Sequence, residues 1–248
     1  MPNTVTVTQF ASVGNQLVNQ ATFQPVRGGL TPEQETLLKS VPNLNNKDVL
    51  IIGDSIMHGD GWEGGFANLI SETYPGARIT NLSTSGAGLV GDYIFNQLAY
   101  ALTQGFKPDY LLMDGGGIDM FLSATLGTVD FSQYTDIPSA STMVDALEHI
   151  FNIARYYMPD AKIIFCTLYK LNPVASTATP PYLVQKSVWE EIKKSCEKYS
   201  VAVCDFYNES NFIQFDTFVT KYFSDFIHIN ELGYRWLWNK LKDVITNA

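Results

Sequence analysis

The chain has few basic residues and no long apolar run. Its 16 Lys and Arg residues stand against 25 Asp and Glu residues, which gives a formal net charge of -9. This balance argues against a nucleic acid or an anionic membrane as partner. No stretch approaches the roughly 18 apolar residues of a membrane-spanning helix, so we expect no membrane insertion. The start of the chain, MPNTVTVTQF, also lacks the basic and then apolar order of a signal peptide. We therefore expect a soluble protein without an export signal.

Cysteine is equally scarce. Cys166, Cys196 and Cys204 form no CxxC pair, and three cysteines cannot all pair within one chain. Because free cysteine is usually buried, we predict three buried thiols in a reducing compartment.

Composition divides the chain into two parts. Residues 47–248 predict one catalytic domain, because α/β folds of this size are commonly single units. Residues 1–46 form an N-terminal appendage, in which residues 4–8 alternate like a strand and Thr31 begins a short helix through Leu38. The appendage weakly resembles connectors in phage tail proteins, although we favour a flexible leader or an extra edge strand. The expected location is the cytoplasm or a virion or prophage particle, and the oligomeric state stays open.

From Asp48 onward, apolar runs of strand length alternate with helical stretches. The runs are residues 49–52, 77–82, 110–113, 163–166 and 201–204. Such alternation predicts a parallel sheet covered by helices. Residues 142–157 predict an amphipathic helix, and residues 231–245 predict a last helix with Leu232, Trp236, Leu237 and Leu241 on its buried side.

A serine follows the first predicted strand directly, in the segment Gly53-Asp54-Ser55-Ile56. Ligands of open α/β sheets bind at the carboxyl ends of the strands, so Ser55 is a candidate nucleophile. The next helix would direct its N-terminal amides toward developing negative charge. An ordinary turn with serine as helix cap is the alternative.

A serine hydroxyl needs a base, and the chain has 3 histidines. His228 follows Asp225 by three residues, a spacing that lets the carboxylate accept the Nδ1 proton while Nε2 faces a nucleophile. His149 falls near the polar face of its helix and is expected at the surface. His58 could border the pocket, but no carboxylate is evident to orient it. The alternative for Asp225 and His228 is a pair of loop and cap residues.

The chain resembles the SGNH hydrolases, also called GDSL-type esterases and lipases, over about residues 47–246. Three motifs carry the resemblance: Gly53-Asp54-Ser55, Asn81-x-Ser83-x-x-Gly86 and Asp225-x-x-His228. The resemblance implies a flavodoxin-like three-layer α/β/α sandwich with a parallel sheet of about five strands. It also implies a carboxylic ester hydrolase that needs no metal and no organic cofactor.

The resemblance assigns a role to each motif residue. Ser55 is the nucleophile, His228 the general base and acid, and Asp225 the residue that orients His228. The backbone amides of Ser55 and Gly86 are two donors of the oxyanion hole. In the family's third motif, Gly-x-Asn-Asp, Ile118 replaces the asparagine that supplies a further donor. Losing one such donor typically costs about 10²- to 10³-fold in rate.

Other pocket candidates are Asp54, His58, Gly116 and Gly117, where a glycine run lets the backbone approach a substrate closely. Residues 122–137 are long for a plain connection and could form a substrate loop. Residues 86–91 fit GxGxxG, but they follow the second predicted strand and lack a convincing acidic partner, so we disfavour a dinucleotide site.

The leading hypothesis is an esterase that removes small acyl groups, such as acetyl, from a carbohydrate. The alternative is a weakly active or inactive domain that binds glycans, with a phage tail as one location for it. This alternative rests on Ile118 and on aromatic residues that could stack on sugars, namely Trp62, Tyr93, Tyr182 and Trp189. Core or surface packing is the more ordinary interpretation of these aromatics.

Overall fold

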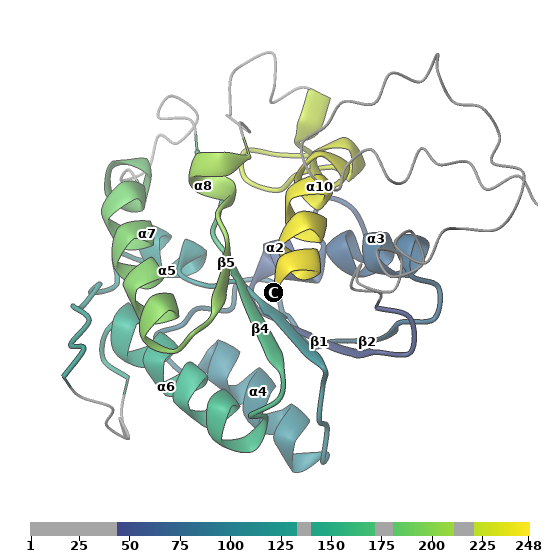
Figure 1. The fold of residues 1–248 in the computed structure, drawn as a ribbon. Coiled ribbons are helices and arrows are strands. Elements are labelled where there is room, and N and C mark those ends of the chain that lie inside the picture. Colours follow the sequence, from purple (N-terminus) through teal and green to yellow (C-terminus); the bar gives the residue numbers. More distant parts are fainter. Residues whose placement is uncertain (1–43, 133–139, 172–180, 211–220) are drawn as a thin grey trace, which may run out of the picture. The chain divides into compact units, whose positions relative to one another are not determined.

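A computed structural model describes residues 44–132, 140–171, 181–210 and 221–248. Its centre is a parallel five-stranded sheet with the order β2-β1-β3-β4-β5 (Figure 1). The strands are β1 (Asp48–Ile52), β2 (Arg78–Asn81), β3 (Tyr110–Met113), β4 (Lys162–Cys166) and β5 (Ala202–Cys204). Each apolar run in the sequence has become a strand, so the prediction of a parallel sheet is confirmed.

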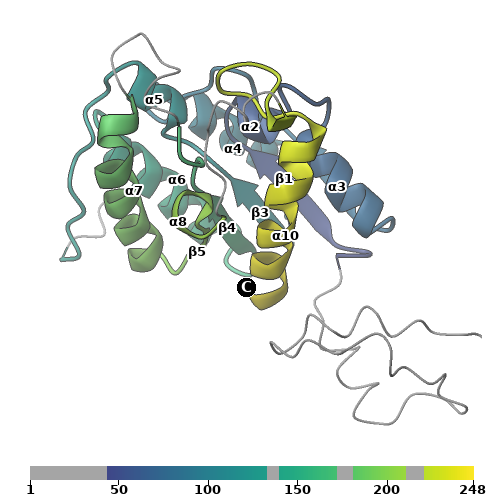
Figure 2. The same cartoon turned by 90° about the horizontal axis from the view of Figure 1, so that it is seen from above.

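Helices cover both faces of the sheet (Figure 2). On one face lie α3 (Gly65–Thr73), α8 (Phe206–Glu209) and α10 (Glu231–Asn247), which contact one another. On the other lie α4 (Tyr93–Thr103), α5 (Gly117–Phe121), α6 (Met143–Tyr157) and α7 (Pro181–Lys198). The short α2 (Ser55–His58) follows β1. The predicted three-layer α/β/α sandwich is confirmed.

The central strands are buried because helices cover them on both sides. All four apolar residues of β1, from Val49 to Ile52, have no exposed surface, and β3 is buried along its whole length. The chain passes from β1 to β2 on one side of β1 and then crosses to β3 on its other side. In open α/β sheets such a reversal marks the place where ligands bind, here the carboxyl ends of β1 and β3.

The predicted helix at residues 142–157 is α6. It begins where the Thr142 hydroxyl accepts a hydrogen bond from the amide of Asp145 at 3.1 Å. His149 was expected at the surface, but it is half-buried against Phe95 of α4, with ring centroids 4.6 Å apart. The surface prediction was wrong because α6 packs on α4 at the margin of its apolar stripe.

The last predicted helix is α10, but its buried face differs from the expected one. Leu237 and Leu241 are buried as predicted, whereas Leu232 and Trp236 are exposed. The buried stripe instead includes Tyr234, Trp238 and Ile245, together with Gly233. The buried face of α10 is therefore rotated about the helix axis by about one residue position from the face that the sequence predicted.

All three cysteines are free and buried, as expected. In the described ranges, no helix is long and apolar enough to cross a membrane. The strand and helix predicted at residues 4–8 and 31–38 lie outside the described residues, as does the end of the predicted substrate loop, residues 133–137.

Candidate active site

Ser55 lies at the carboxyl end of β1, where the strand gives way to α2. Gly53 makes the sharp change of direction at a φ of 143°, which favours glycine. The Asp54 carboxylate then accepts a hydrogen bond from the amide of Ile56 at 2.9 Å and caps α2. Ser55 is therefore the first residue of a helix directly behind a buried strand, as the sequence predicted.

Ser55, His228 and Asp225 form one hydrogen-bonded chain across 173 residues of sequence. The Nε2 atom of His228 lies 3.0 Å from the Ser55 hydroxyl oxygen. The Nδ1 atom lies 2.6 Å from the Oδ2 atom of Asp225. A neutral imidazole that donates from Nδ1 to the carboxylate leaves Nε2 free to accept the serine proton. The structure thus brings together the three residues that the sequence singled out.

The loop before α10 holds His228 in place. The second oxygen of Asp225 accepts hydrogen bonds from the amides of Ile227 and His228 at 2.8 and 2.7 Å. The amide of Ser224 in turn donates to the His228 carbonyl at 2.9 Å. Burial raises the pKa of Asp225, but its hydrogen bonds from His228 and Ile227 outweigh burial and hold the pKa below its ordinary value. Asp225 is therefore ionised at neutral pH.

Two buried side chains from other elements hold the turn that carries Ser55. The side-chain amide of Gln97, on α4, pairs with both backbone groups of Gly53. It accepts a hydrogen bond from the Gly53 amide at 2.7 Å and donates one to the Gly53 carbonyl at 3.0 Å. Asp114, directly after β3, accepts from the amide of Asp54 at 2.8 Å. A Cβ atom on Gly53 would lie 1.9 Å from the Asp114 carboxylate, so only glycine admits this contact.

Asp114 and Asp54 also hydrogen-bond to each other and are 6% and 5% exposed. Burial and the neighbouring Asp54 carboxyl raise the pKa of Asp114 well above its ordinary value. Burial raises the pKa of Asp54 as well. Sequence reasoning named Asp54 as a pocket residue but did not find this pair. The signal was a carboxylate immediately after the strand that neighbours β1.

Asp60 is a second acidic residue that the sequence did not reveal. Its Oδ2 atom lies 3.8 Å from Nε2 of His228 and accepts a hydrogen bond from the Ser85 hydroxyl. Its Oδ1 atom lies 2.7 Å from Nδ1 of His58. Burial raises the pKa of Asp60, but the hydrogen bonds from Ser85 and His58 outweigh burial and lower the pKa overall. The expectation that no carboxylate orients His58 was therefore wrong.

The predicted oxyanion donors lie in two loops at the same edge of the sheet. Gly86 is exposed in the loop after β2, with a φ of 78° and nothing near its would-be Cβ. The buried Asp119 side chain fixes this loop by accepting from the amides of Leu89 and Val90 at 2.8 and 2.9 Å. Ile118 is half-buried in α5, and its side chain offers no donor.

Two further pocket candidates, Gly116 and Gly117, face the interior. Both are buried, and a Cβ on Gly117 would lie 2.9 Å from an oxygen of Asp54. A void of about 10 Å³ lies beside Gly117, Asp54 and Trp189. In the described part of the chain, no cluster of three or more His, Cys, Asp or Glu side chains could hold a metal ion.

Comparison with known proteins identifies the family. The model of the GDSL-like lipase/acylhydrolase family matches residues 51–236. The chain belongs to this family. It is accordingly an ester hydrolase, and Ser55, Asp225 and His228 all lie within the matched residues. None of the curated proteins compared matches the chain.

Solved structures agree on the fold of this GDSL-like hydrolase. A protein from Lactobacillus plantarum is 20% identical, with a TM-score of 0.68 over 81% of this chain and 97% of the other. A member of the lipolytic G-D-S-L family from Veillonella parvula is 17% identical, with a TM-score of 0.60 over 81% and 99%. A lipase/acylhydrolase from Enterococcus faecalis is 15% identical, with a TM-score of 0.56 over 81% and 96%. These likenesses concern the fold alone.

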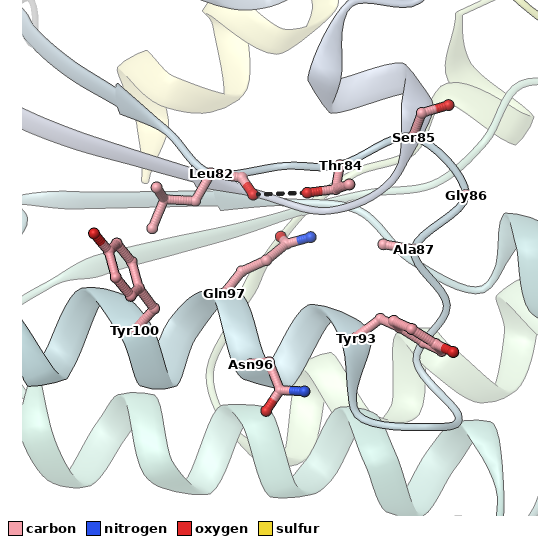
Figure 3. Close-up of a pocket in the computed structure, with 9 residues that line it drawn as sticks. All are labelled: Leu82, Thr84, Ser85, Gly86, Ala87, Tyr93, Asn96, Gln97 and Tyr100. Atoms are coloured by element: carbon pink, nitrogen blue, oxygen red, sulfur yellow. Dashed lines mark hydrogen bonds between the residues drawn. The ribbon is translucent and has the colours of Figure 1, made fainter.

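An open groove of about 460 Å³ adjoins the Gly86 loop of this hydrolase (Figure 3). One wall is the segment after β2, which contributes Leu82, Thr84, Ser85, Gly86 and Ala87. The other wall is α4, which contributes Tyr93, Asn96, Gln97 and Tyr100. The groove is therefore formed next to a predicted oxyanion donor.

Proposed function

We propose that Ser55, His228 and Asp225 hydrolyse the ester through an acyl-enzyme. The hydrogen bond of 3.0 Å between Nε2 of His228 and the Ser55 hydroxyl is the observation that carries this proposal. The Ser55 oxygen attacks the ester carbonyl while its proton passes to Nε2. Asp225 stabilises the imidazolium that forms, because it is ionised and bonded to Nδ1.

The remaining steps use the same groups. The tetrahedral intermediate collapses, the carbon–oxygen bond to the alcohol breaks, and His228 gives its proton to the departing oxygen. Water then attacks the acyl-enzyme, with His228 as base, and the intermediate releases the carboxylic acid and restores the Ser55 hydroxyl. The amides of Ser55 and Gly86 are the proposed donors to the oxyanion, and Ile118 supplies none.

The proposed substrate carries a small acyl group, such as acetyl, on a carbohydrate. The interior void beside Asp54 and Gly117 is about 10 Å³, room for about one water-sized probe, so an acyl chain could not extend inward between these residues. The half-buried Asp60 carboxylate lies 3.8 Å from Nε2 of His228, where it can accept hydrogen bonds from hydroxyl groups of an alcohol. These two observations support a short acyl group and a polyhydroxylated alcohol.

Hydrolysis of p-nitrophenyl esters of increasing chain length tests the proposal. The native protein and Ser55→Ala are measured side by side, with Ser71→Ala as a matched control, because Ser71 is an exposed serine on α3 that takes no part in the chain of Ser55, His228 and Asp225. We expect activity on the acetate that falls with chain length, persists in the control and vanishes in Ser55→Ala. Undiminished turnover by Ser55→Ala would refute the proposed nucleophile.

A second candidate function is glycan binding with little or no hydrolysis. Ile118 favours it, because losing one oxyanion donor costs about 10²- to 10³-fold in rate. Of the aromatics first considered, Trp189 is buried and Trp62 is half-buried against Tyr234, whereas Tyr93 is exposed. The side chain of Tyr182 lies outside the described residues. Glycan binding without turnover on any ester would support this function over the first.

Residues 1–46 remain a proposed attachment segment, and a virion, a prophage particle or the cytoplasm remains the proposed location. Deleting residues 1–46 and measuring the oligomeric state and location tests this role. Unchanged behaviour of the truncated protein would remove the reason for it.

A further inference from the structure

Two exposed tyrosines mark the α4 wall of the groove. Tyr93 and Tyr100 are seven residues apart on α4, so they stand on the same side of the helix about two turns from each other. Their exposed fractions are 63% and 57%, although tyrosine rings usually bury much of their surface. Asn96, between them, is also exposed and adds an amide that can donate and accept.

The segment that forms the other wall of the groove also contacts the groups around His228. Ser85 and Gly86 line the groove. The Ser85 hydroxyl donates to Asp60, whose carboxylate lies 3.8 Å from Nε2 of His228. Gly86 is the proposed donor to the oxyanion. When the ester carbonyl of a substrate is at Ser55, the remainder of that substrate would therefore lie beside this segment.

We propose that this groove, the α4 groove, binds a sugar ring of the carbohydrate that carries the ester. The inference rests on the proposed function and deepens it, because it places the alcohol part of the substrate. Tyrosine faces stack on the apolar faces of sugar rings, while hydroxyl and amide groups bond to the sugar hydroxyls. Tyr93, Tyr100, Asn96 and Thr84 supply this combination of groups.

An acyl chain is a poorer occupant of the α4 groove. Acyl chains require an enclosed apolar surface, whereas Thr84, Ser85 and Asn96 are polar and exposed. Leu82 and Ala87, which are half-buried and buried, add apolar surface to the wall after β2. The mixed lining fits a ring with one apolar face and polar edges.

Binding to the Ser55→Ala protein tests the groove without turnover. The probes are partially O-acetylated oligosaccharides built from xylose, mannose or N-acetylglucosamine, titrated by calorimetry. We expect at least one probe to bind, and the added double change Tyr93→Ala with Tyr100→Ala to weaken that binding about tenfold or more. Tyr156→Ala is the matched control, because Tyr156 is a 76% exposed tyrosine on α6 outside the groove.

Two outcomes would overturn the inference. One is that no probe binds, or that binding is equally strong with and without the two tyrosines. The other is that the double variant loses kcat/KM on p-nitrophenyl decanoate relative to the acetate, which would make the occupant an acyl chain. Failure of the proposed function has a different signature, since it would appear as acetate hydrolysis that does not depend on Ser55.

Discussion

Replacing Asp114 by asparagine tests whether the carboxyl pair beneath Ser55 keeps a proton in the folded protein. Asp54 and Asp114 are buried and hydrogen-bonded to each other, so two negative charges there would repel strongly. Burial, followed by the Asp54 charge, raises the pKa of Asp114 well above 3.8. In the unfolded chain this carboxyl would ionise at about its ordinary pKa.

The Asp114 proton makes the free energy of unfolding depend on pH. At pH values between the unfolded and the folded pKa of Asp114, the folded protein holds one more proton than the unfolded chain. The free energy of unfolding should therefore fall as pH rises through this window, by about 1.4 kcal/mol per pH unit for one proton. Below the unfolded pKa both states are protonated, so this contribution to stability is fully present.

Asparagine removes the proton but keeps the hydrogen bonds. In the native protein the Asp54 amide donates to the Asp114 carboxylate at 2.8 Å, and the carbonyl oxygen of asparagine can accept the same bond. The NH₂ group of asparagine can donate to the Asp54 carboxylate. Burial raises the pKa of Asp54, whereas the hydrogen bond from Asp114 lowers it, and asparagine can donate the same bond. The part of the pH dependence that belongs to Asp114 should therefore disappear in Asp114→Asn.

Urea unfolding across the range from about pH 4 to 8 measures the effect. The difference in unfolding free energy between Asp114→Asn and the native protein should grow in favour of the variant as pH rises. Asp160→Asn is the control, because Asp160 is an exposed carboxylate before β4 and its replacement should leave the pH slope unchanged. Equal slopes for the native protein and Asp114→Asn would refute the shared proton.

Four other substitutions probe separate parts of the molecule. Asp225→Asn should lower kcat about 10³- to 10⁴-fold by favouring the wrong imidazole tautomer. The Tm of the protein should stay nearly unchanged because Asp225 is exposed. Ile118→Asn should raise kcat on p-nitrophenyl acetate up to about 10²-fold, and no gain would mean that the side chain cannot reach the oxyanion. Thr142→Ala should cost about 1 kcal/mol in urea unfolding through loss of the α6 cap. Gln97→Leu should cost about 1–3 kcal/mol for each unpaired group of Gly53 and lower kcat, measured by unfolding and by steady-state kinetics.

The sheet could be predicted from the sequence because strands buried on both faces are continuous apolar runs. Residues 49–52 and 110–113 show this directly, since both became central strands. The hydrogen-bonded chain through Ser55 and His228 could also be predicted. A serine after the first strand and an Asp-x-x-His before the last helix are both expected at the carboxyl edge of a parallel sheet, and the family resemblance joins them.

Features that depend on packing between elements were not predictable. The burial of His149 depends on how α6 crosses α4, and the exposure of Trp236 depends on how α10 is rotated on the sheet. Asp114 contacts Asp54, which is 60 residues away in sequence, and Asp60 contacts Ser85, which is 25 residues away. The place of Asp114 directly after a strand marks it as a candidate, but no local pattern reveals either partner. A motif shows which residues react, whereas the groups that hold them emerge only in the folded chain.

The structure separates the positioning of Ser55 from the stabilisation of the oxyanion. Gln97 and Asp114 both hold the turn before Ser55, so the proposed nucleophile should keep its place whatever occupies position 118. Asp119 fixes the Gly86 loop through two backbone amides, independently of its neighbour Ile118. The two proposed donors that remain are backbone groups, which side-chain substitution does not remove. We therefore expect that substitution at position 118 changes the reaction rate while the fold and the proposed catalytic residues stay unchanged.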